Sequence, residues 1–266
     1  MRKPEKEISD YLRDLEARSV NVFMCGSQEE DKRYTLHNKD RYINVIKELD
    51  RILRKMKKPV KILDIGTSPL TFMLKKRYPH AQIFSVDYTS RLSALCGKFG
   101  VKFKQVDLNR RNFKLPSHKF NIVLFLEVIE HLSGDHAHIM KNILCYMESD
   151  SYCIIQTPNK NSLKSFVTRL LSMDRVDNVS KRPNLSHEFE HVKEYSFDEL
   201  KKFVKSFLEV DLLKAEHSLY FDTVDSSVVY RKYSVIIIPI LFLFYITVGM
   251  IPPLRRGLLF VVQKRT

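Results

Sequence analysis

The chain of 266 residues is strongly basic and apolar enough to fold. Hydrophobic residues make up 44% of it, which argues against disorder, and its net charge is +14. A positive surface favours phosphate-bearing partners such as nucleic acid, anionic lipid headgroups or a phosphorylated substrate, unless it is simply a solvated lysine-rich surface. The four cysteines form no CxxC pair, so neither a zinc knuckle nor a disulfide framework is indicated and a reducing compartment fits best. The charged N-terminus lacks the apolar core of a secretory signal peptide.

Two domains of unequal size are predicted in chain order. Residues 1–58 are charged and end in an apolar pattern at helical spacing, which predicts an N-terminal helical cap. Residues 59–266 alternate short apolar runs with helical patterns, which is typical of an α/β domain. Within that domain, residues 160–195 are polar and irregular like an inserted lid, and residues 233–253 carry an apolar, membrane-associating segment.

Five apolar runs predict parallel strands covered on both faces, because nearly every position in them is apolar. They read VKILDIG, AQIFSVD, VKFKQVD, FNIVLFL and YCIIQTP, all within residues 60–158. A helix over about residues 196–207 and the run FLEVDLLKAEHS follow, and GLLFVVQK stands near the end of the chain.

Acidic residues and a glycine follow the first three strands. Asp64, Gly66 and Thr67 end the first strand and enter a turn, where a glycine lets the backbone approach a ligand closely. Asp87 ends the second strand, where its carboxylate can accept hydrogen bonds from both hydroxyls of a ribose. Asp107 is expected to end the third strand, near the exocyclic amine of an adenine. The carboxyl ends of parallel strands meet at one edge, so we expect a nucleotide site there, unless these acids only cap strands or helices.

The glycine turn excludes a dinucleotide-binding dehydrogenase and resembles another family. GTSPLTF cannot supply the G-x-G-x-x-G fingerprint of the dehydrogenases. The D-x-G motif, the ribose acid and the adenine-side acid resemble those of the class I S-adenosylmethionine-dependent methyltransferases, although Ser68 replaces the second glycine of the family's D-x-G-x-G. The resemblance implies S-adenosyl-L-methionine as the cofactor.

The same resemblance implies the fold. We expect an α/β, Rossmann-like, seven-stranded and mostly parallel sheet with helices on both faces and an antiparallel terminal hairpin. GLLFVVQK, residues 257–264, is then the natural seventh strand, and the apolar segment becomes an insertion in that hairpin.

Residues 120–132, FNIVLFLEVIEHL, resemble the fourth strand and following turn of the methyltransferase subgroup that includes the ubiquinone-biosynthesis O-methyltransferases. This resemblance implies that Leu126 contacts the cofactor through its backbone. A shorter resemblance over residues 36–41, LHNKDR, implies that Arg41 reaches the cofactor carboxylate, for which its planar fork is suited.

Glu127, Glu130 and His131 stand three and four residues apart, and they share one face if the segment is helical. Two carboxylates and an imidazole suit Mg²⁺, Mn²⁺ or Zn²⁺, unless Glu130 and His131 only shape the turn. The ubiquinone-pathway enzymes and the small-RNA 2′-O-methyltransferases, which this E-x-x-E-H resembles, both bind a divalent metal with it. The RNA enzymes add a downstream histidine, a part that His191 fits, with His187 in reserve.

Methyl transfer is an in-line displacement, so the enzyme positions the nucleophile and removes its proton. A hydroxyl nucleophile needs a nearby base or a metal that lowers its pKa. His131 and His191 are the catalytic candidates, and His187 is again the reserve.

The predicted lid and the apolar segment both suggest a membrane. The lid carries apolar residues at helical spacing between lysines and arginines, typical of a helix resting on an anionic membrane or of an ordinary packed lid. Residues 235–251 are seventeen uncharged residues, about 26 Å of helix against a ~30 Å hydrocarbon core. If GLLFVVQK rejoins the sheet, the insertion leaves and returns on one side, which favours a monotopic or re-entrant anchor on the cytoplasmic face. A buried core or dimer helix and a true transmembrane helix are the alternatives.

Three functions follow as hypotheses. The first is O-methylation of a lipid-linked or amphiphilic substrate at a membrane surface. The second is a metal-dependent RNA 2′-O-methyltransferase, favoured by the E-x-x-E-H motif and the positive charge, and disfavoured by the apolar segment. The third is a non-catalytic membrane scaffold that keeps the fold, for which Ser68 is the support.

Overall fold

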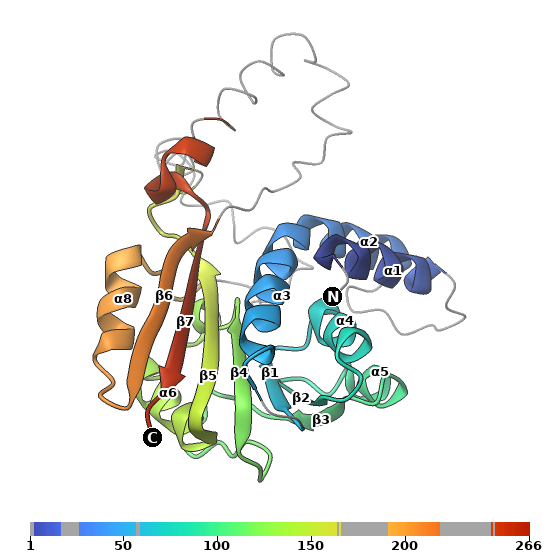
Figure 1. Ribbon diagram of the computed structural model, residues 1–266, viewed down its shortest axis with the longest axis horizontal. Coiled ribbons are helices and arrows are strands. Elements are labelled where there is room, and N and C mark those ends of the chain that lie inside the picture. The colour runs from blue at the N-terminus through green and yellow to red at the C-terminus, as the bar shows by residue number, and fades with distance from the viewer. Residues whose placement is uncertain are drawn as a thin grey trace, which may run out of the picture.

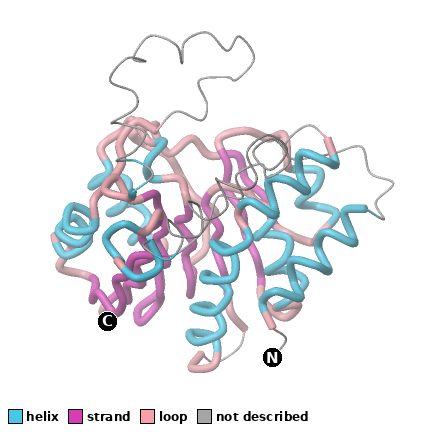
Figure 2. Tube along the Cα trace, turned by 90° about the horizontal axis from the view of Figure 1, so that it is seen from above, coloured by secondary structure: helices cyan, strands magenta, loops and turns pink. Residues whose placement is uncertain are grey.

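One seven-stranded sheet forms the centre of the molecule, in the order β3-β2-β1-β4-β5-β7-β6. The computed structural model describes residues 3–16, 27–56, 59–163, 165, 191–218, 246 and 248–266. Helices cover both faces of the sheet (Figures 1 and 2). The predicted α/β, Rossmann-like fold is therefore confirmed.

The strands run parallel from β3 to β5, and β7 is antiparallel to both β5 and β6. Their bounds are β1 (Lys61–Ile65), β2 (Gln82–Asp87), β3 (Lys102–Gln105), β4 (Phe120–Leu126), β5 (Met147–Pro158), β6 (Val210–Ser218) and β7 (Gly257–Lys264). The bounds of β4 and β7 are those predicted. The third strand is shorter than predicted: it ends two residues before Asp107, whose carboxylate accepts a hydrogen bond from the Asn109 N–H and turns the chain.

The helices are α1 (Pro4–Glu16), α2 (Gln28–His37), α3 (Lys39–Leu53), α4 (Pro69–Arg77), α5 (Ser93–Lys98), α6 (His136–Cys145) and α8 (Phe197–Lys205). Short 3₁₀ turns cover Ile129–His131 and Pro252–Leu254.

Continuous apolar runs in the strands arise because both faces of the sheet are buried. In β4, Ile122 and Leu124 join one hydrophobic cluster, while Val123 and Phe125 join the other. Successive side chains of a strand point to opposite faces, so a strand covered by helices on both sides must be apolar throughout.

The N-terminal helices pack against this core. Val45, Ile46 and Leu49 of α3 are fully buried in the same cluster as residues of α4 and β1. The buried Arg77 guanidinium at the end of α4 pairs with Glu7 of α1 at 2.9 Å and with Asp50 of α3 at 2.7 Å. The predicted boundary at residue 58 falls between α3 and β1, although α3 shares a core with the sheet.

The terminal hairpin has a long connection over residues 219–256, and both ends of it lie at one edge of the sheet. Ser218, the last residue of β6, is paired with Gly257, the first residue of β7, and Gly257 is also paired with Pro158 at the end of β5. The chain therefore leaves and re-enters the sheet at the carboxyl edge of the parallel strands.

The predicted lid and the predicted apolar segment lie mostly outside the described residues. Of the apolar segment 235–251 only Ile246 and residues 248–251 are described, and of the lid 160–195 only residues 160–163, 165 and 191–195. Among the helices that the structure describes, none has the length and apolar character needed to cross a membrane.

Candidate active site

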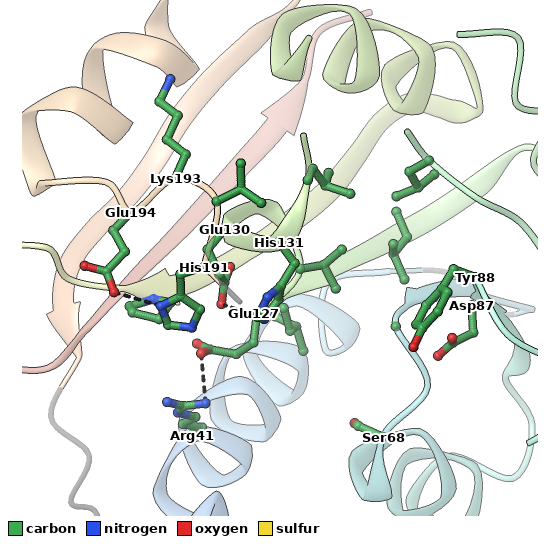
Figure 3. Close-up of a pocket in the computed structure, with 18 of the residues that line it drawn as sticks. Arg41, Ser68, Asp87, Tyr88, Glu127, Glu130, His131, His191, Lys193 and Glu194 are labelled. Atoms are coloured by element: carbon green, nitrogen blue, oxygen red, sulfur yellow. Dashed lines mark hydrogen bonds and ion pairs between the residues drawn. The ribbon is translucent and has the colours of Figure 1, made fainter. Parts of the chain in front are cut away.

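A cavity of about 1250 Å³ opens at the carboxyl edge of the parallel strands (Figure 3). One side of it, here the β1–β4 side, is lined by residues at or just after the ends of β1, β2, β3 and β4. The other, the β5–β7 side, is lined by Pro158, Lys160, Ser162, Ser165, residues 191–194 and Arg256. Helices α2 and α3 complete the wall with Tyr34, Asn38 and Arg41.

The turn after β1 requires glycine. Gly66 has a φ of +88°, and a Cβ atom there would lie 2.7 Å from the Val128 side chain. The next residue, Thr67, donates its backbone N–H to Asp87 at 3.0 Å and shares a hydrogen bond of 2.8 Å with the Ser85 hydroxyl. The turn and the end of β2 are thus held together at the cavity floor.

Asp64 lies behind this turn and is absent from the residues that line the cavity. Its carboxylate accepts a hydrogen bond from the Thr71 hydroxyl at 2.5 Å, and that hydroxyl accepts one from the Ser68 N–H at 3.0 Å. Burial raises the pKa of Asp64 to about 7 against the opposing Thr71 bond, and the nearby Asp87 charge adds to the rise. Ser68, where the family has glycine, has an extended φ of −140° that any residue adopts, so serine fits here.

The ends of β2 and β3 bring two further predicted acids to the cavity. Asp87 is partly buried, which raises its pKa, while hydrogen bonds from the Thr89 and Thr67 N–H groups oppose the rise. Asp107 lines the cavity from the turn beyond β3. Tyr88, which the sequence reasoning missed, also lines it and is 48% exposed. An aromatic residue directly after Asp87, at the end of the second predicted strand, is the signal that would have found Tyr88.

The end of β4 connects the sheet to α3. Leu126 lines the cavity, and Glu127 after it has a φ of +54°, a left-handed conformation that is costly outside glycine. The Glu127 carboxylate pairs with Arg41 at 2.8 Å (Figure 3). Arg41 also donates to the Asn38 side-chain oxygen at 3.0 Å. Because only Ile129–His131 is helical, Glu127 does not share a helical face with Glu130 and His131 as its spacing predicted.

Three of the four predicted metal ligands come together instead. Candidate ligand atoms of Glu130, His131 and His191 lie within 4.8 Å of one another, and the two imidazole rings are 5.1 Å apart. His191 approaches because the Val192 and Lys193 N–H groups donate to the Glu130 carbonyl oxygen at 2.7 and 3.1 Å. His187 lies outside the described residues.

Glu130 is the buried member of this trio. Its Oε2 accepts a hydrogen bond of 2.9 Å from Thr157, while its Oε1 lies 3.9 Å from His131 Nε2 and has no hydrogen-bond partner among the residues that the structure describes. Burial, followed by the neighbouring Glu127 charge, raises the pKa of Glu130 well above its ordinary value. His191 Nδ1 lies 2.7 Å from the Glu194 carboxylate, which fixes the orientation of the imidazole (Figure 3).

Asn159 joins the segments of the β5–β7 side. Its side-chain amide donates to the carbonyl oxygens of Pro253 at 2.9 Å and Arg255 at 2.8 Å, and its backbone N–H donates to that of Arg256 at 2.7 Å. The neighbouring Lys160 N–H donates to the Tyr195 carbonyl oxygen at 3.0 Å. The sequence reasoning missed Asn159 and the cavity-lining Lys160, because these bonds join segments remote in the chain.

Comparison with known proteins agrees with this geometry. A family model described as "Methyltransferase domain" matches residues 36–207, more than half of the chain, while no curated protein matches significantly. The plantazolicin methyltransferase BpumL, solved with S-adenosylhomocysteine, is 14% identical with a TM-score of 0.55, over 97% of this chain and 99% of that one. The N-methyltransferase NodS of Bradyrhizobium japonicum, also solved with S-adenosylhomocysteine, is 9% identical with a TM-score of 0.51 over the whole of both chains.

An S-adenosylmethionine-dependent methyltransferase of Thermotoga maritima is 14% identical to this chain, with a TM-score of 0.52, over 90% of this chain and 95% of that one. These likenesses are of fold, since the identities are low, and the family model covers the glycine turn, the strand-end acids and the Glu130-His131 pair. The chain belongs to the methyltransferase domain family and is an enzyme with the class I, S-adenosylmethionine-dependent fold.

Proposed function

We propose that the enzyme transfers a methyl group from S-adenosyl-L-methionine to an oxygen of a lipid-linked or amphiphilic acceptor at the cytoplasmic face of a membrane. The observation that carries the proposal is topological. The connection over residues 219–256 starts and ends at the sheet edge where the cavity opens, and it contains the seventeen uncharged residues 235–251. An apolar segment tethered at both ends beside the site favours an anchor that enters and leaves one membrane surface.

The β1–β4 side fits the cofactor. Gly66 leaves room for a ligand against the backbone, Asp87 can accept hydrogen bonds from ribose hydroxyls, and Asp107 lies at the neighbouring strand end. Tyr88 offers an apolar face, Arg41 lines the cavity with a guanidinium suited to the cofactor carboxylate, and Leu126 and Thr67 supply backbone groups. BpumL and NodS, solved with S-adenosylhomocysteine, support the choice of cofactor. When bound, S-adenosyl-L-methionine supplies a methyl group on a sulfonium centre.

His131 and His191 are the candidate bases for the acceptor hydroxyl. Both imidazoles line the cavity, between the end of β4 and the β5–β7 side. Glu194 holds the Nδ1 atom of His191, so its Nε2 atom is the one left for a proton from the acceptor. Removing that proton strengthens the oxygen nucleophile.

A divalent cation, Mg²⁺ or Zn²⁺, is the alternative to an imidazole base in this proposal, because an imidazole nitrogen that holds a metal cannot also accept a proton. Glu130, His131 and His191 would hold it, and it would lower the pKa of an acceptor hydroxyl. The Glu130 Oε1 atom is buried, has no hydrogen-bond partner in the described part of the chain and faces two imidazoles, which fits such an ion. Glu127, also expected as a ligand, is paired with Arg41. Zinc retained after dialysis by the wild type and lost by His191→Ala would support the site; equal metal content would contradict it.

An RNA 2′-O-methyltransferase is the alternative. The Glu130-His131-His191 trio favours it, together with the basic residues Lys160 and Arg256 that line the β5–β7 side.

One incubation separates the two acceptors. The full chain is mixed with methyl-labelled S-adenosyl-L-methionine and either a total lipid extract or total RNA. Label in the lipid fraction is the expected result, and label in RNA alone would overturn the lipid assignment. Detergent-free cell fractionation adds a check, because a wholly soluble full-length protein would contradict the membrane part.

A further inference from the structure

We propose that Ile246, Met250 and Ile251 form a docking surface for an anionic lipid bilayer, and that the active-site cavity opens toward the bilayer beside this surface. The inference rests on the proposed function and adds to it the residues that make contact and the orientation of the enzyme.

The side chains of Ile246, Met250 and Ile251 are large, apolar and exposed to solvent. Met250 is 76% exposed and Ile251 46% exposed, and Ile246 is also exposed. Val192, on the wall of the cavity, is 57% exposed. Exposed apolar residues that gather in one short stretch mark interaction surfaces more often than scattered single ones do.

The docking surface is fixed to the edge of the sheet. Arg255 donates to the Gly249 carbonyl oxygen at 2.8 Å and to that of His217, near the end of β6, at 3.2 Å. Asn159, directly after β5, donates to the carbonyl oxygens of Pro253 and Arg255. Residues 249–256 are therefore held between the ends of β5 and β6, so the docking surface has a set position relative to the cavity.

This position is on the same edge as the active site. Gly257 is paired with both Pro158 and Ser218, so the chain enters β7 at the carboxyl edge of the parallel strands. In Figure 1 the turn before β7 stands beyond the ends of β5, β6 and β7, at the top of the view. Pro158 and Arg256 line the cavity, so the cavity wall and the docking surface are parts of one connected stretch.

Charge and sequence favour a bilayer over a second protein chain as the occupant. Lys160, Lys193 and Arg256 line the cavity on this side, and the chain as a whole carries a net charge of +14. Basic residues next to exposed apolar ones match a surface of anionic headgroups over an apolar interior. The three residues of the surface belong to the uncharged run of residues 235–251.

The test is co-sedimentation of the full chain with vesicles of phosphatidylcholine mixed with phosphatidylglycerol. The variant Met250→Glu/Ile251→Glu introduces charge into the docking surface. The control is Leu208→Glu, a residue that is 82% exposed and lies just before β6 begins, at the opposite edge of the sheet. Binding of S-adenosylhomocysteine is measured on the same samples to show that each variant is folded.

We expect the double variant to bind vesicles at least about tenfold more weakly than the wild type, with Leu208→Glu unchanged. Equal loss in both variants, or none in either while the wild type binds, would overturn the docking surface and leave membrane association standing. A wild type that binds S-adenosylhomocysteine but no vesicles would overturn both the docking surface and membrane association, and leave the methyltransferase assignment intact.

Discussion

The two sides of the cavity are built in different ways. On the β1–β4 side, Gly66, Asp87 and Leu126 each lie within one residue of a strand end, so the sheet alone brings them together. On the β5–β7 side, Lys160, His191 and Arg256 come from segments far apart in the chain. Asn159 donates hydrogen bonds to the carbonyl oxygens of Arg255 and Arg256, and Lys160 donates one to that of Tyr195. The residues after His191 donate to the Glu130 carbonyl oxygen. The edge of the sheet thus fixes the geometry of the β1–β4 side. The β5–β7 side is built by long connections, and its residues differ from those of the β1–β4 side in charge and exposure.

The electrostatics of the two sides differ as well. Burial raises the pKa of Asp87, which lines the β1–β4 side, and of Asp64 behind it. The β5–β7 side instead presents the basic residues Lys160, Lys193 and Arg256. The first side suits a ligand with hydroxyl and amine groups, and the second suits an acceptor that carries negative charge.

The largest effect is expected at Gly66. In Gly66→Val a branched side chain would have to adopt a φ of +88° and would contact Val128, at a cost of more than about 3 kcal/mol. We predict loss of S-adenosylhomocysteine binding by calorimetry and a lower melting temperature. Gly97→Ala is the control, because a Cβ atom there meets nothing within 4 Å. Wild-type affinity in Gly66→Val would contradict this view of the turn.

The second effect concerns pH and Asp64. Its pKa rises from 3.8 to about 7 on folding, so the folded state holds a proton that the unfolded state releases in this range. This contribution to stability is present below about pH 4 and is lost as the pH rises to about 7, by up to about 4 kcal/mol. Asp64→Asn should therefore flatten the fall of melting temperature across that window. An unchanged pH profile would show that Asp64 is ionised in the folded protein.

The third effect is at the bridge between the sheet and α3. Arg41→Met leaves the Glu127 carboxylate without its charge partner in a partly buried place, which should cost about 3 kcal/mol of unfolding free energy in urea. Arg41→Met/Glu127→Gln should recover part of that loss. Arg51→Met, which breaks a more exposed pair with Glu48, should cost about 0.5 kcal/mol. If the double variant loses as much stability as Arg41→Met and Glu127→Gln lose together, the two side chains are not coupled.

The smallest effect on stability, and the sharpest contrast between the two sides, is expected for Asn159→Ala. It removes the side-chain hydrogen bonds to Pro253 and Arg255, at about 1–2 kcal/mol. Affinity for S-adenosylhomocysteine should stay at the wild-type value, while vesicle binding falls because residues 249–256 lose their support. A variant that loses cofactor affinity as well would show that the two sides are not independent.

The sequence predicted the position of most of its candidate residues on the β1–β4 side, because these residues follow a local pattern. Buried strands such as β4 are apolar at every position, and the residues after them lie at the edge by necessity. The prediction was weaker where a single backbone angle decides: the positive φ of Glu127 turns its carboxylate toward Arg41 instead of toward Glu130. Asp64 does not line the cavity as predicted, for another reason: a hydrogen bond from the Thr71 hydroxyl holds its carboxylate behind the turn.

The β5–β7 side was harder to predict because its contacts are long-range. The approach of His191 to Glu130 depends on backbone hydrogen bonds from Val192 and Lys193, which have no signature in the sequence. Glu194 and Asn159 are ordinary polar residues until their partners are known. The seventh strand could be placed, because the family resemblance implies a terminal hairpin and GLLFVVQK is an apolar run in the right place for its second strand.

Calorimetric titration of the wild-type chain with S-adenosylhomocysteine tests the central claim most directly, namely that the β1–β4 side is the cofactor site of a working methyltransferase. We predict binding in the micromolar range, strongly weakened in Asp87→Ala and unchanged in Met250→Glu/Ile251→Glu. No binding at millimolar ligand by the folded wild-type chain would contradict the account and support a scaffold that keeps the fold without the cofactor.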